Sequence, residues 1–392
     1  MRLRDLGLTV GYGTPGPYNA ITDIAGVQVG HTTLISGDGP LRPGRGPVRT
    51  GVTVIRPVPG YVRQTPLYAG VHVLNGNGEM TGTAWISESG LLTTPIALTN
   101  THSVGVVRDA LVAIDNRQGR TATKGRAAYW SMPVVAETYD GVLNDIDGAH
   151  VRPEHVDAAF ESAAAGVVAE GSVGGGTGMI CHDFKGGIGT ASRVLPEQAG
   201  GWTVAALVQA NHGTREDLRF DGVPVGRFLP GSVVPTPHAN AQASLPEPGT
   251  GSIIVIIATD APVLADQCRR IAQRATIGIG RSGGGTSDSS GDIFLAFSTA
   301  NHASPEYFMP GEAAAGFTDV RAVPHDNLTP LFAAAAEATE EAILNALLAA
   351  DDMTGRDGLT AHGLTAQMLR HAYSAASEDL RRTAGQLDRA NN

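Results

Sequence analysis

The chain has 392 residues, of which 51 are glycine, 23 are proline and 42% are hydrophobic. Glycine is well above its ordinary share of roughly 7%, yet glycine and proline together stay below the level of a low-complexity chain, so the composition predicts a folded protein with many special backbone sites. The net charge of −10, without a long Lys/Arg cluster, argues against nucleic acid as a partner. Two cysteines are too few for a disulfide framework.

The N-terminal residues, Met1 to Leu6, are followed by glycines and prolines rather than by an apolar run. The sequence therefore shows no signal peptide and no membrane span, and we expect a cytoplasmic protein with no membrane partner. The length alone allows two or three domains. We expect one large unit that spans residues 1–392.

Strands are expected where β-branched and apolar residues are dense between glycines or prolines. These segments are residues 51–56, 69–74, 201–209, 252–258 and 292–298. Helices are expected where apolar residues recur every three or four positions. Such stripes begin at Pro153 and end at Gly171, follow Pro262, begin near Thr329, and cover about 364–388.

The connection between Asn211 and Ser252 is unusual. Residues 212–251 contain six prolines and no sustained periodicity, and an apolar strand follows immediately. Loops longer than roughly 12–15 residues tend to be functional or disordered. Cleavage of the chain would need a long connection that leads directly into a core strand. The connection can then relax after the cut while the sheet stays intact.

Two glycine-rich patterns lie close together in the sequence. Residues 278–283 match the dinucleotide pattern G-x-G-x-x-G, but we expect loop and then strand after them instead of the helix that this mechanism requires. Residues 280–284 match the nucleophile-elbow pattern G-x-S-x-G, which needs a strand-turn-helix context. A serine hydrolase that uses Ser282 is therefore one alternative function, and a non-catalytic binding protein is another.

Metal ligands are not evident from spacing. His150 and His155 are separated by a stretch that contains proline, and His182 beside Cys181 has no partner pair at ligand spacing. We expect dispersed histidines and no metal site. Cys268 lies on the apolar side of an expected helix, which predicts a buried, inert thiol.

The Gly251-Ser252 junction suggests a different chemistry. Glycine tolerates backbone conformations closed to other residues, so the Gly251 carbonyl can be held in a strained geometry that the Ser252 hydroxyl attacks. Cleavage there would make Ser252 a new N-terminus, whose α-amine, with a pKa of about 7.7–8.0, can act as general base for its own hydroxyl. The alternative is an ordinary turn before a strand.

Motifs over nearly the whole chain resemble the self-processing serine aminopeptidases of the P1 (S58) family, the group of L-aminopeptidase/D-amino-acid esterase-amidases and β-peptidyl aminopeptidases. In chain order, the segments that carry the resemblance are residues 19–23, 26–27, 29–31, 133–135, 137–141, 143–145, 171–178, 184–193, 211–213, 251–252, 290–292 and 294–298.

The resemblance implies an α/β (α+β) fold, a four-layer αββα sandwich similar to N-terminal nucleophile hydrolases but with different connectivity. It implies cleavage at Gly251-Ser252 into an α chain of residues 1–251 and a β chain of residues 252–392, and a homotetramer of such αβ protomers. The implied activity removes N-terminal residues from short peptides, amides or esters through an acyl-enzyme, without a metal or an organic cofactor.

The resemblance also implies roles for individual residues. Ser252 matches the nucleophile, with its own amine as base. Asn211 matches a side-chain amide of the oxyanion hole, and the backbone N–H of Ile253 is a plausible second donor. Ser290 and Asp292 match a serine and an acidic residue that orient the nucleophile. The acidic residue is often Glu in the family, and the shorter Asp292 could alter its reach.

Two further positions are implied within the 137–141 motif. Tyr139 matches a tyrosine implicated in stabilising the intermediate in the L-aminopeptidase/D-esterase type. Glu137 lies in the stretch from which an acidic residue contacts the substrate amine in members that cleave β-peptides. A tyrosine in this run could equally serve packing.

Overall fold

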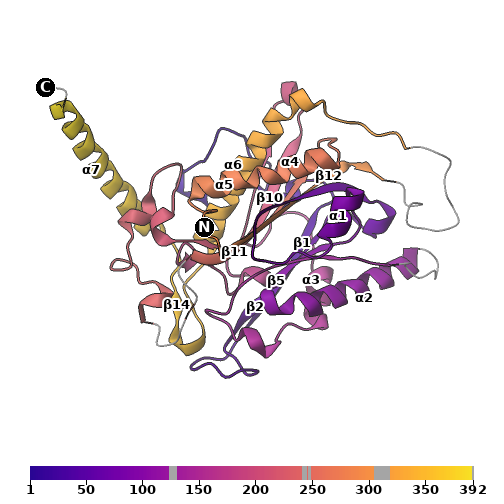
Figure 1. Ribbon diagram of the computed structural model, residues 1–392, viewed down its shortest axis with the longest axis horizontal. Coiled ribbons are helices and arrows are strands. Elements are labelled where there is room, and N and C mark those ends of the chain that lie inside the picture. Colours follow the sequence, from indigo (N-terminus) through magenta and orange to yellow (C-terminus); the bar gives the residue numbers. More distant parts are fainter. Residues whose placement is uncertain (123–129, 241–244, 246–248, 304–317, 391–392) are drawn as a thin grey trace.

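The computed structural model describes residues 1–122, 130–240, 245, 249–303 and 318–390. Two β-sheets lie face to face in the body of the molecule, and helices cover their outer faces (Figure 1). The last helix, α7 (Ala366–Ala390), extends away from this body. None of the helices in the described ranges combines the length and the apolar character that crossing a membrane requires.

The larger sheet has six strands in the order β4-β3-β12-β11-β10-β9. Their bounds are β3 Leu67–Gly76, β4 Leu91–Leu92, β9 Gly187–Val194, β10 Thr203–Gly213, β11 Gly249–Thr259 and β12 Gly291–His302. β11 pairs antiparallel with β10 and parallel with β12. It is an interior strand with neighbours on both edges.

The smaller sheet has four strands in the order β1-β2-β5-β6. Their bounds are β1 Gln28–Ser36, β2 Val48–Arg56, β5 Ile96–Asn100 and β6 Val134–Thr138. Two hairpin-like pairs complete the list, β7 Ile180–Cys181 with β8 Phe184–Lys185, and β13 Met353–Thr354 with β14 Thr360–Ala361.

The hydrophobic core has three layers, one between the two sheets and one between each sheet and its helices. Side chains that alternate along a strand belong to the layers on its two faces. Ile254 and Ile256 of β11 pack between the two sheets, whereas Ile253, Val255 and Ile257 face the helices on the other side. Because β11 is buried on both faces, its sequence is an uninterrupted apolar run instead of an alternating one.

Five helices form the two outer layers. The six-stranded sheet is covered by α4 (Ala265–Gln273), α5 (Ala275–Ser282) and α6 (Thr329–Ala349). The four-stranded sheet is covered by α2 (Val104–Ala122) and α3 (Pro153–Glu161), while the short α1 (Thr83–Ser89) packs beside β3. The expected four-layer αββα sandwich is confirmed.

The expected strands correspond to β2, β3, β10, β11 and β12, although β10 begins at Thr203, two residues later than expected. Three of the expected helices are α4, α6 and α7. The helix expected from Pro153 to Gly171 is too long in the prediction, because α3 ends at Glu161 and Val167 is 86% exposed. After the helix, the backbone of Ala164 pairs with Val29 of β1 instead of continuing the turn.

Residues 278–282 form the C-terminal part of α5, a helix that the sequence did not predict, and Gly283 follows its end in a left-handed conformation. A Cβ atom on Gly278 would lie 2.6 Å from the carbonyl oxygen of Ala336 in α6. The glycine therefore serves the close contact between α5 and α6, and the pattern ends a helix instead of opening one. This context excludes the dinucleotide mechanism.

The segment expected as a tether is packed over most of its described length. Leu218, Phe220, Val225 and Leu229 are fully buried in the core beside the six-stranded sheet. The expectation of an unstructured connection is therefore wrong for residues 214–240. Residues 241–244 and 246–248 of this connection lie outside the described part of the chain.

Candidate active site

Strand register places Ser252 between two other predicted site residues. In the six-stranded sheet, Ser252 of β11 lies opposite Asn211 of β10. The next residue, Ile253, lies opposite Asp292 of β12. Three adjacent strands thus bring the hydroxyl, the amide and the carboxylate to one end of the sheet, although they are far apart in the sequence.

The Gly251-Ser252 bond is held from the start of β12. The Ser290 hydroxyl lies within hydrogen-bond distance of the Gly251 carbonyl oxygen, and the backbone N–H of Gly291 donates to Ser252 Oγ at 3.0 Å. Ser252 and Ser290 are 7% and 3% exposed. The carbonyl and the hydroxyl of the junction are therefore both oriented by two consecutive residues in a largely dry environment.

Glycine is required at position 251 for a reason other than the expected one. Its φ lies outside the left-handed region, so no special backbone conformation is present. A Cβ atom there would instead lie 1.7 Å from the carbonyl oxygen of Asn211. Close approach of β10 excludes every side chain at this position.

Asp292 connects the residues around the junction. Its carboxylate accepts hydrogen bonds from Ser290 Oγ at 2.6 Å, Asn75 Nδ2 at 3.0 Å and the backbone N–H of Ile253 at 3.3 Å. Burial raises the pKa of Asp292, and these hydrogen bonds oppose that rise. The N–H of Ile253, expected as an oxyanion donor, is thus engaged by Asp292 in the uncut chain.

The Asn211 side chain has a fixed orientation. Its Oδ1 accepts from the backbone N–H of Ile180 at 2.8 Å, and its Nδ2 donates to the Tyr139 carbonyl at 3.0 Å. The same Nδ2 lies 3.2 Å from the position that a Gly251 Cβ would occupy. The donor end of the amide is therefore directed to the side of the junction.

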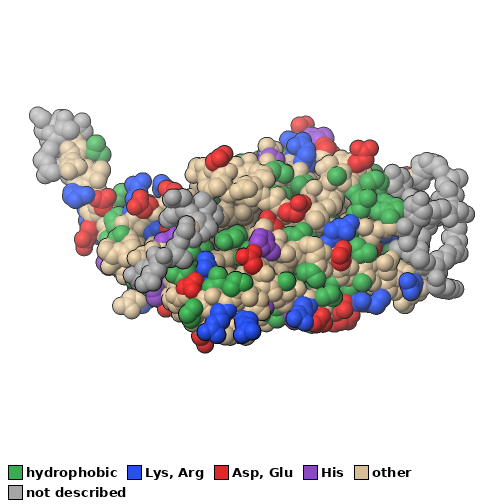
Figure 2. Space-filling model, turned by 60° about the horizontal axis from the view of Figure 1, so that its bottom comes forward, with side chains coloured by type: hydrophobic (Ala, Val, Ile, Leu, Met, Phe, Trp, Pro, Cys, Tyr) green, Lys and Arg blue, Asp and Glu red, His purple; other side chains and the backbone are tan. Residues whose placement is uncertain are grey.

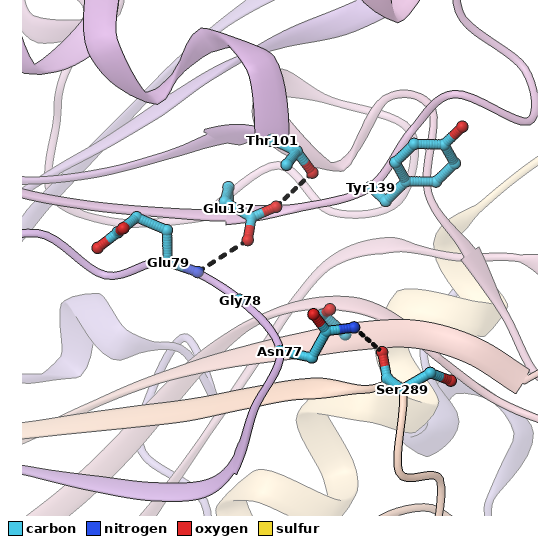
Figure 3. A pocket seen from close by; sticks show the side chains of 8 residues that line it. Asn77, Gly78, Glu79, Thr101, Glu137, Tyr139 and Ser289 are labelled. Carbon is cyan, nitrogen blue, oxygen red and sulfur yellow. Dashed lines mark hydrogen bonds between the residues drawn. The ribbon is translucent and has the colours of Figure 1, made fainter.

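A pocket of about 390 Å³ opens beside Ser252 (Figure 3). The residues that line it are Asn77, Gly78, Glu79, Thr101, Glu137, Tyr139, Ser252 and Ser289. The sequence-predicted residues Glu137 and Tyr139 therefore share one cavity with the predicted nucleophile. The described lining residues carry two carboxylates and no Lys or Arg, so the pocket suits a cationic ligand end.

Glu137 is oriented by the pocket wall. Oε1 accepts from the backbone N–H of Glu79 at 2.9 Å, and Oε2 accepts from the Thr101 hydroxyl (Figure 3). Burial raises the pKa of Glu137, and it also raises that of Tyr139. The Tyr139 phenol is directed away from Glu137, so the two side chains serve different parts of the cavity.

Asn75, Asn77, Thr101 and Gly291 are site residues that the sequence reasoning missed. The first two lie in and directly after β3, and Asn77 Nδ2 donates to the Ser289 carbonyl at 2.7 Å. The asparagine-glycine repeat of residues 75–78 is the signal that could have indicated a functional loop. Its position beside β12 follows only from the strand order.

Ser282 does not have the setting of a nucleophile. It is the last residue of α5, it is fully buried, and its hydroxyl donates to the Ile279 carbonyl at 2.9 Å. A nucleophile elbow needs a strand-turn-helix. The alternative mechanism that uses Ser282 therefore has no structural support.

The expectation of dispersed histidines is wrong for two of them. Cys181, His182 and His212 are all buried, and their candidate ligand atoms lie within 4.8 Å of one another. The backbone N–H of His182 donates to the carbonyl oxygen of His212 at 2.8 Å, and this contact between the β7-β8 hairpin and β10 brings the three residues together. Cys268, in contrast, is the buried thiol on α4 that the sequence predicted.

Comparison with known proteins places the chain among relatives of similar length. A model of Peptidase family S58 matches residues 19–361. A beta-peptidyl aminopeptidase of Sphingosinicella microcystinivorans is 51% identical over 375 residues, which cover 95% of this chain and 90% of the relative.

Two solved structures resemble the whole fold. A Burkholderia sp. beta-aminopeptidase has 56% identity and a TM-score of 0.87, with 96% of this chain and 99% of the other covered. The L-aminopeptidase D-Ala-esterase/amidase of Ochrobactrum anthropi, described as a variant of the Ntn hydrolase fold, has 45% identity and a TM-score of 0.86 over the same shares. With the family model matched over most of its length, the chain belongs to peptidase family S58.

Proposed function

We propose that this peptidase is a serine aminopeptidase that first cuts its own chain between Gly251 and Ser252. The products would be an α chain of residues 1–251 and a β chain of residues 252–392. The processed enzyme then removes N-terminal residues from short peptides, amides or esters. The observation that carries the proposal is the Gly251-Ser252 junction, whose carbonyl and hydroxyl are both held by residues 290–291.

Self-cleavage begins with attack of Ser252 Oγ on the carbonyl carbon of Gly251. The developing oxyanion is stabilised by the Ser290 hydroxyl, whose single proton turns from Asp292 to the Gly251 oxygen, and the nearby Asn211 amide adds a second donor. The C–N bond breaks as the hydroxyl proton moves to the departing nitrogen, which leaves an ester on Ser252. Water hydrolyses this ester, and the products are the Gly251 carboxylate and a free Ser252 hydroxyl and amine.

Substrate turnover uses the amine that cleavage creates. With a pKa of about 7.7–8.0 for an α-amine, it accepts the Ser252 hydroxyl proton as Oγ attacks the substrate carbonyl, and it then protonates the leaving amine. The Asp292 carboxylate is placed to orient the amine, because it already binds the next backbone N–H, that of Ile253. Asn211 Nδ2 supplies the neutral donor for the oxyanion.

Substrate recognition follows from the acidic pocket. A substrate with a free N-terminus carries an ammonium group, and the buried Glu137 carboxylate is an anion that hydrogen bonds hold in a fixed orientation in the cavity. The volume of about 390 Å³ lies in the range of small-ligand sites. Since one relative is named a beta-peptidyl aminopeptidase and another a beta-aminopeptidase, we expect β-amino acyl anilides among the substrates. Their hydrolysis rates, compared with those of the matching α-amino acyl anilides, test this expectation.

The decisive experiment is intact mass measurement and N-terminal sequencing of the purified protein. We expect two fragments, residues 1–251 and 252–392, the second starting Ser252-Ile253-Ile254. Ser252→Ala should yield a full-length, inactive chain, whereas Ser282→Ala should be cut and active. An uncut protein with full peptidase activity would disprove the proposal.

Assembly into a homotetramer of processed protomers is part of the proposal. Leu369 and Ala372 anchor the first turns of α7 in the core, but further along the same helix Leu380 and Leu387 are 68% and 62% exposed. Seven positions apart, these two leucines lie on one helix face, which fits contact with a second copy. Light scattering should show smaller particles for Leu380→Lys than for wild type, with Glu378→Ala on another face as the control.

A further inference from the structure

The buried cluster of Cys181, His182 and His212 lies outside the pocket. Cys181 ends β7, His182 follows in the hairpin turn, and His212 comes directly after Asn211 on β10. The Cys181 sulfur is 3.8 Å from His212 Nδ1, and the two imidazole rings meet edge to face with centroids 5.2 Å apart. Two segments far apart in the sequence thus converge on one point.

The polar atoms of this cluster are incompletely satisfied. His182 Nδ1 contacts the Thr214 carbonyl oxygen at 2.8 Å, so Nδ1 carries the proton and Nε2 holds a free lone pair. Among the described residues, His182 Nε2 is buried with no hydrogen-bond partner, and so is His212 Nε2, although His212 faces Cys181 through its other nitrogen, Nδ1. A buried polar atom without a partner is costly and needs an explanation.

We propose that Cys181, His182 and His212 bind one zinc ion. A thiolate and neutral imidazoles are the ligands that Zn²⁺ prefers, whereas Ca²⁺ and Mg²⁺ prefer oxygen. Zn–S and Zn–N bonds of about 2.3 and 2.0–2.1 Å require sulfur and nitrogen atoms about 3.5 Å apart, close to the 3.8 Å between Cys181 Sγ and His212 Nδ1. Binding replaces the thiol proton, which is released to solvent.

The hydrogen bond of His182 supports its assignment as a zinc ligand. Metal-bound histidines usually donate their second ring N–H to a carbonyl or carboxylate, which fixes the tautomer and the ring. The Thr214 carbonyl occupies that position for His182. Nε2 of His182 therefore carries the lone pair, and as a zinc ligand it would no longer be an unsatisfied atom.

The role of such an ion would be structural. It would join the β7-β8 hairpin to β10, and the same hairpin supplies the Ile180 N–H that orients Asn211. Because His212 is adjacent to Asn211, the metal would fix the strand on one side of the amide and the hairpin on the other. The inference concerns residues outside the proposed self-cleavage and stands or falls separately from it.

The test uses the purified full chain, first freed of metal by a chelator. Co²⁺, a spectroscopic substitute for Zn²⁺, should bind with one equivalent per chain and produce a sulfur-to-cobalt charge-transfer band that one equivalent of Zn²⁺ abolishes. Cys181→Ser should lose this band and bind Zn²⁺ at least about 10–100-fold more weakly, the loss that even a supporting residue causes. Cys268→Ser removes the other buried thiol and should behave as wild type.

A second measurement covers the case in which Cys181→Ser does not fold. Zn²⁺ should raise the melting temperature of the chelator-treated wild-type protein and of Cys268→Ser, because it binds only the folded state. No charge-transfer band in the wild type would overturn the proposal, and so would an undiminished band in Cys181→Ser. The masses of the same samples show whether the chain is cut at Gly251-Ser252. The zinc proposal and the self-cleavage proposal can therefore fail independently of each other.

Discussion

Asp292 is the side chain on which the geometry of the junction depends most. It accepts hydrogen bonds from Ser290, Asn75 and the Ile253 backbone, which lie directly before β12, on β3 and on β11. The negative charge of the carboxylate, more than its size, holds these three donors in one place. An amide of the same size could accept fewer hydrogen bonds and would bring its own donors.

We therefore expect Asp292→Asn to lower both self-cleavage and turnover, by at least about 10²-fold, the lower end of what a positioned acid-base group contributes. Asp292→Glu, which restores the charge, should recover much of both. The fraction of cut chain by mass and kcat of the cut fraction are the measurements. Normal processing in the Asn variant would remove the carboxylate from the mechanism.

Glu137 is expected to recognise the substrate ammonium. Glu137→Gln should raise KM for substrates with a free amine by about 10–100-fold, because a hydrogen bond to a charged group contributes roughly 1.5–3 kcal/mol, with a smaller effect on kcat. Glu79→Gln is the matched control, since Glu79 contacts Glu137 through its backbone N–H. Equal KM values in the two variants would contradict this role.

Glu137 also predicts a pH effect on binding. Burial raises the pKa of this carboxyl, and only its ionised form attracts an ammonium group. KM should therefore rise as the pH falls through the raised pKa, and this rise should be absent in Glu137→Gln. Measurement of KM against pH in both proteins checks the sign.

At the scale of single elements, the contact between β10 and β11 decides which residue can precede Ser252. In Gly251→Ala the new methyl group would overlap the Asn211 carbonyl oxygen, at 1.7 Å, so the strands must separate and self-cleavage should be lost. Gly280→Ala lies in α5 with nothing within 4 Å and should gain up to about 1 kcal/mol of stability. Mass measurement and urea unfolding compare the two; efficient cutting of Gly251→Ala would contradict the geometry.

The β7-β8 hairpin contains a fully buried lysine that invites a pH test. Lys185 donates to the carbonyl oxygens of Gly176, Met179 and Gly186 at 3.2, 2.8 and 2.7 Å. Burial lowers its pKa from 10.5 to about 7. Between these values the unfolded chain binds more protons than the folded one, so the free energy of unfolding should increase as the pH rises from about 7.

Lys185→Met should abolish that part of the pH dependence, which has a limiting slope of about 1.4 kcal/mol per pH unit. Both proteins are best compared in the Ser252→Ala background, where the chain stays intact and unfolding is unimolecular. Urea unfolding above about pH 7 gives the two curves. Parallel curves would show that Lys185 does not titrate in this range.

In the whole molecule, the proposed cut would leave two fragments that share the six-stranded sheet. β11 of the second fragment lies between β10 of the first and its own β12. Arg193, on β9, also forms fully or largely buried ion pairs with Glu337 at 3.0 Å and Glu341 at 2.8 Å, both on α6. We expect the fragments to elute together in size-exclusion chromatography and to separate only in denaturant.

The ion pairs themselves should matter for stability. Arg193→Met leaves two carboxylates in the interior without this partner, and breaking a buried pair typically costs about 3–5 kcal/mol. Exposed Arg382, paired with Asp379 on α7, is the control, and Arg382→Met should change stability by less than about 1 kcal/mol. Urea unfolding in the Ser252→Ala background measures both, and equal effects would contradict the buried role.

Basic and acidic side chains also alternate over the face in Figure 2, without a continuous basic stripe. Only the arrangement of side chains, not the net charge, could show this.

The sequence by itself determined the strands that carry the site, the αββα family of folds and the Gly251-Ser252 junction. Apolar runs and short motifs are local properties, because they depend only on residues that are neighbours in the sequence. It did not determine α5, because glycines that allow close helix packing look like loop glycines. The expected reason for a glycine at position 251, a special backbone conformation, was wrong, and α3 ends earlier than expected.

Only the tertiary structure decided which residues meet. Asn75 and Asp292, or Cys181 and His212, become neighbours through the order and register of strands in the six-stranded sheet and its hairpin. That order is set by the burial of each sheet between the other sheet and a layer of helices, a property of the whole chain. The spacing of residues along the sequence does not reveal this strand order. The pocket beside Ser252 and the Cys-His-His cluster both result from it.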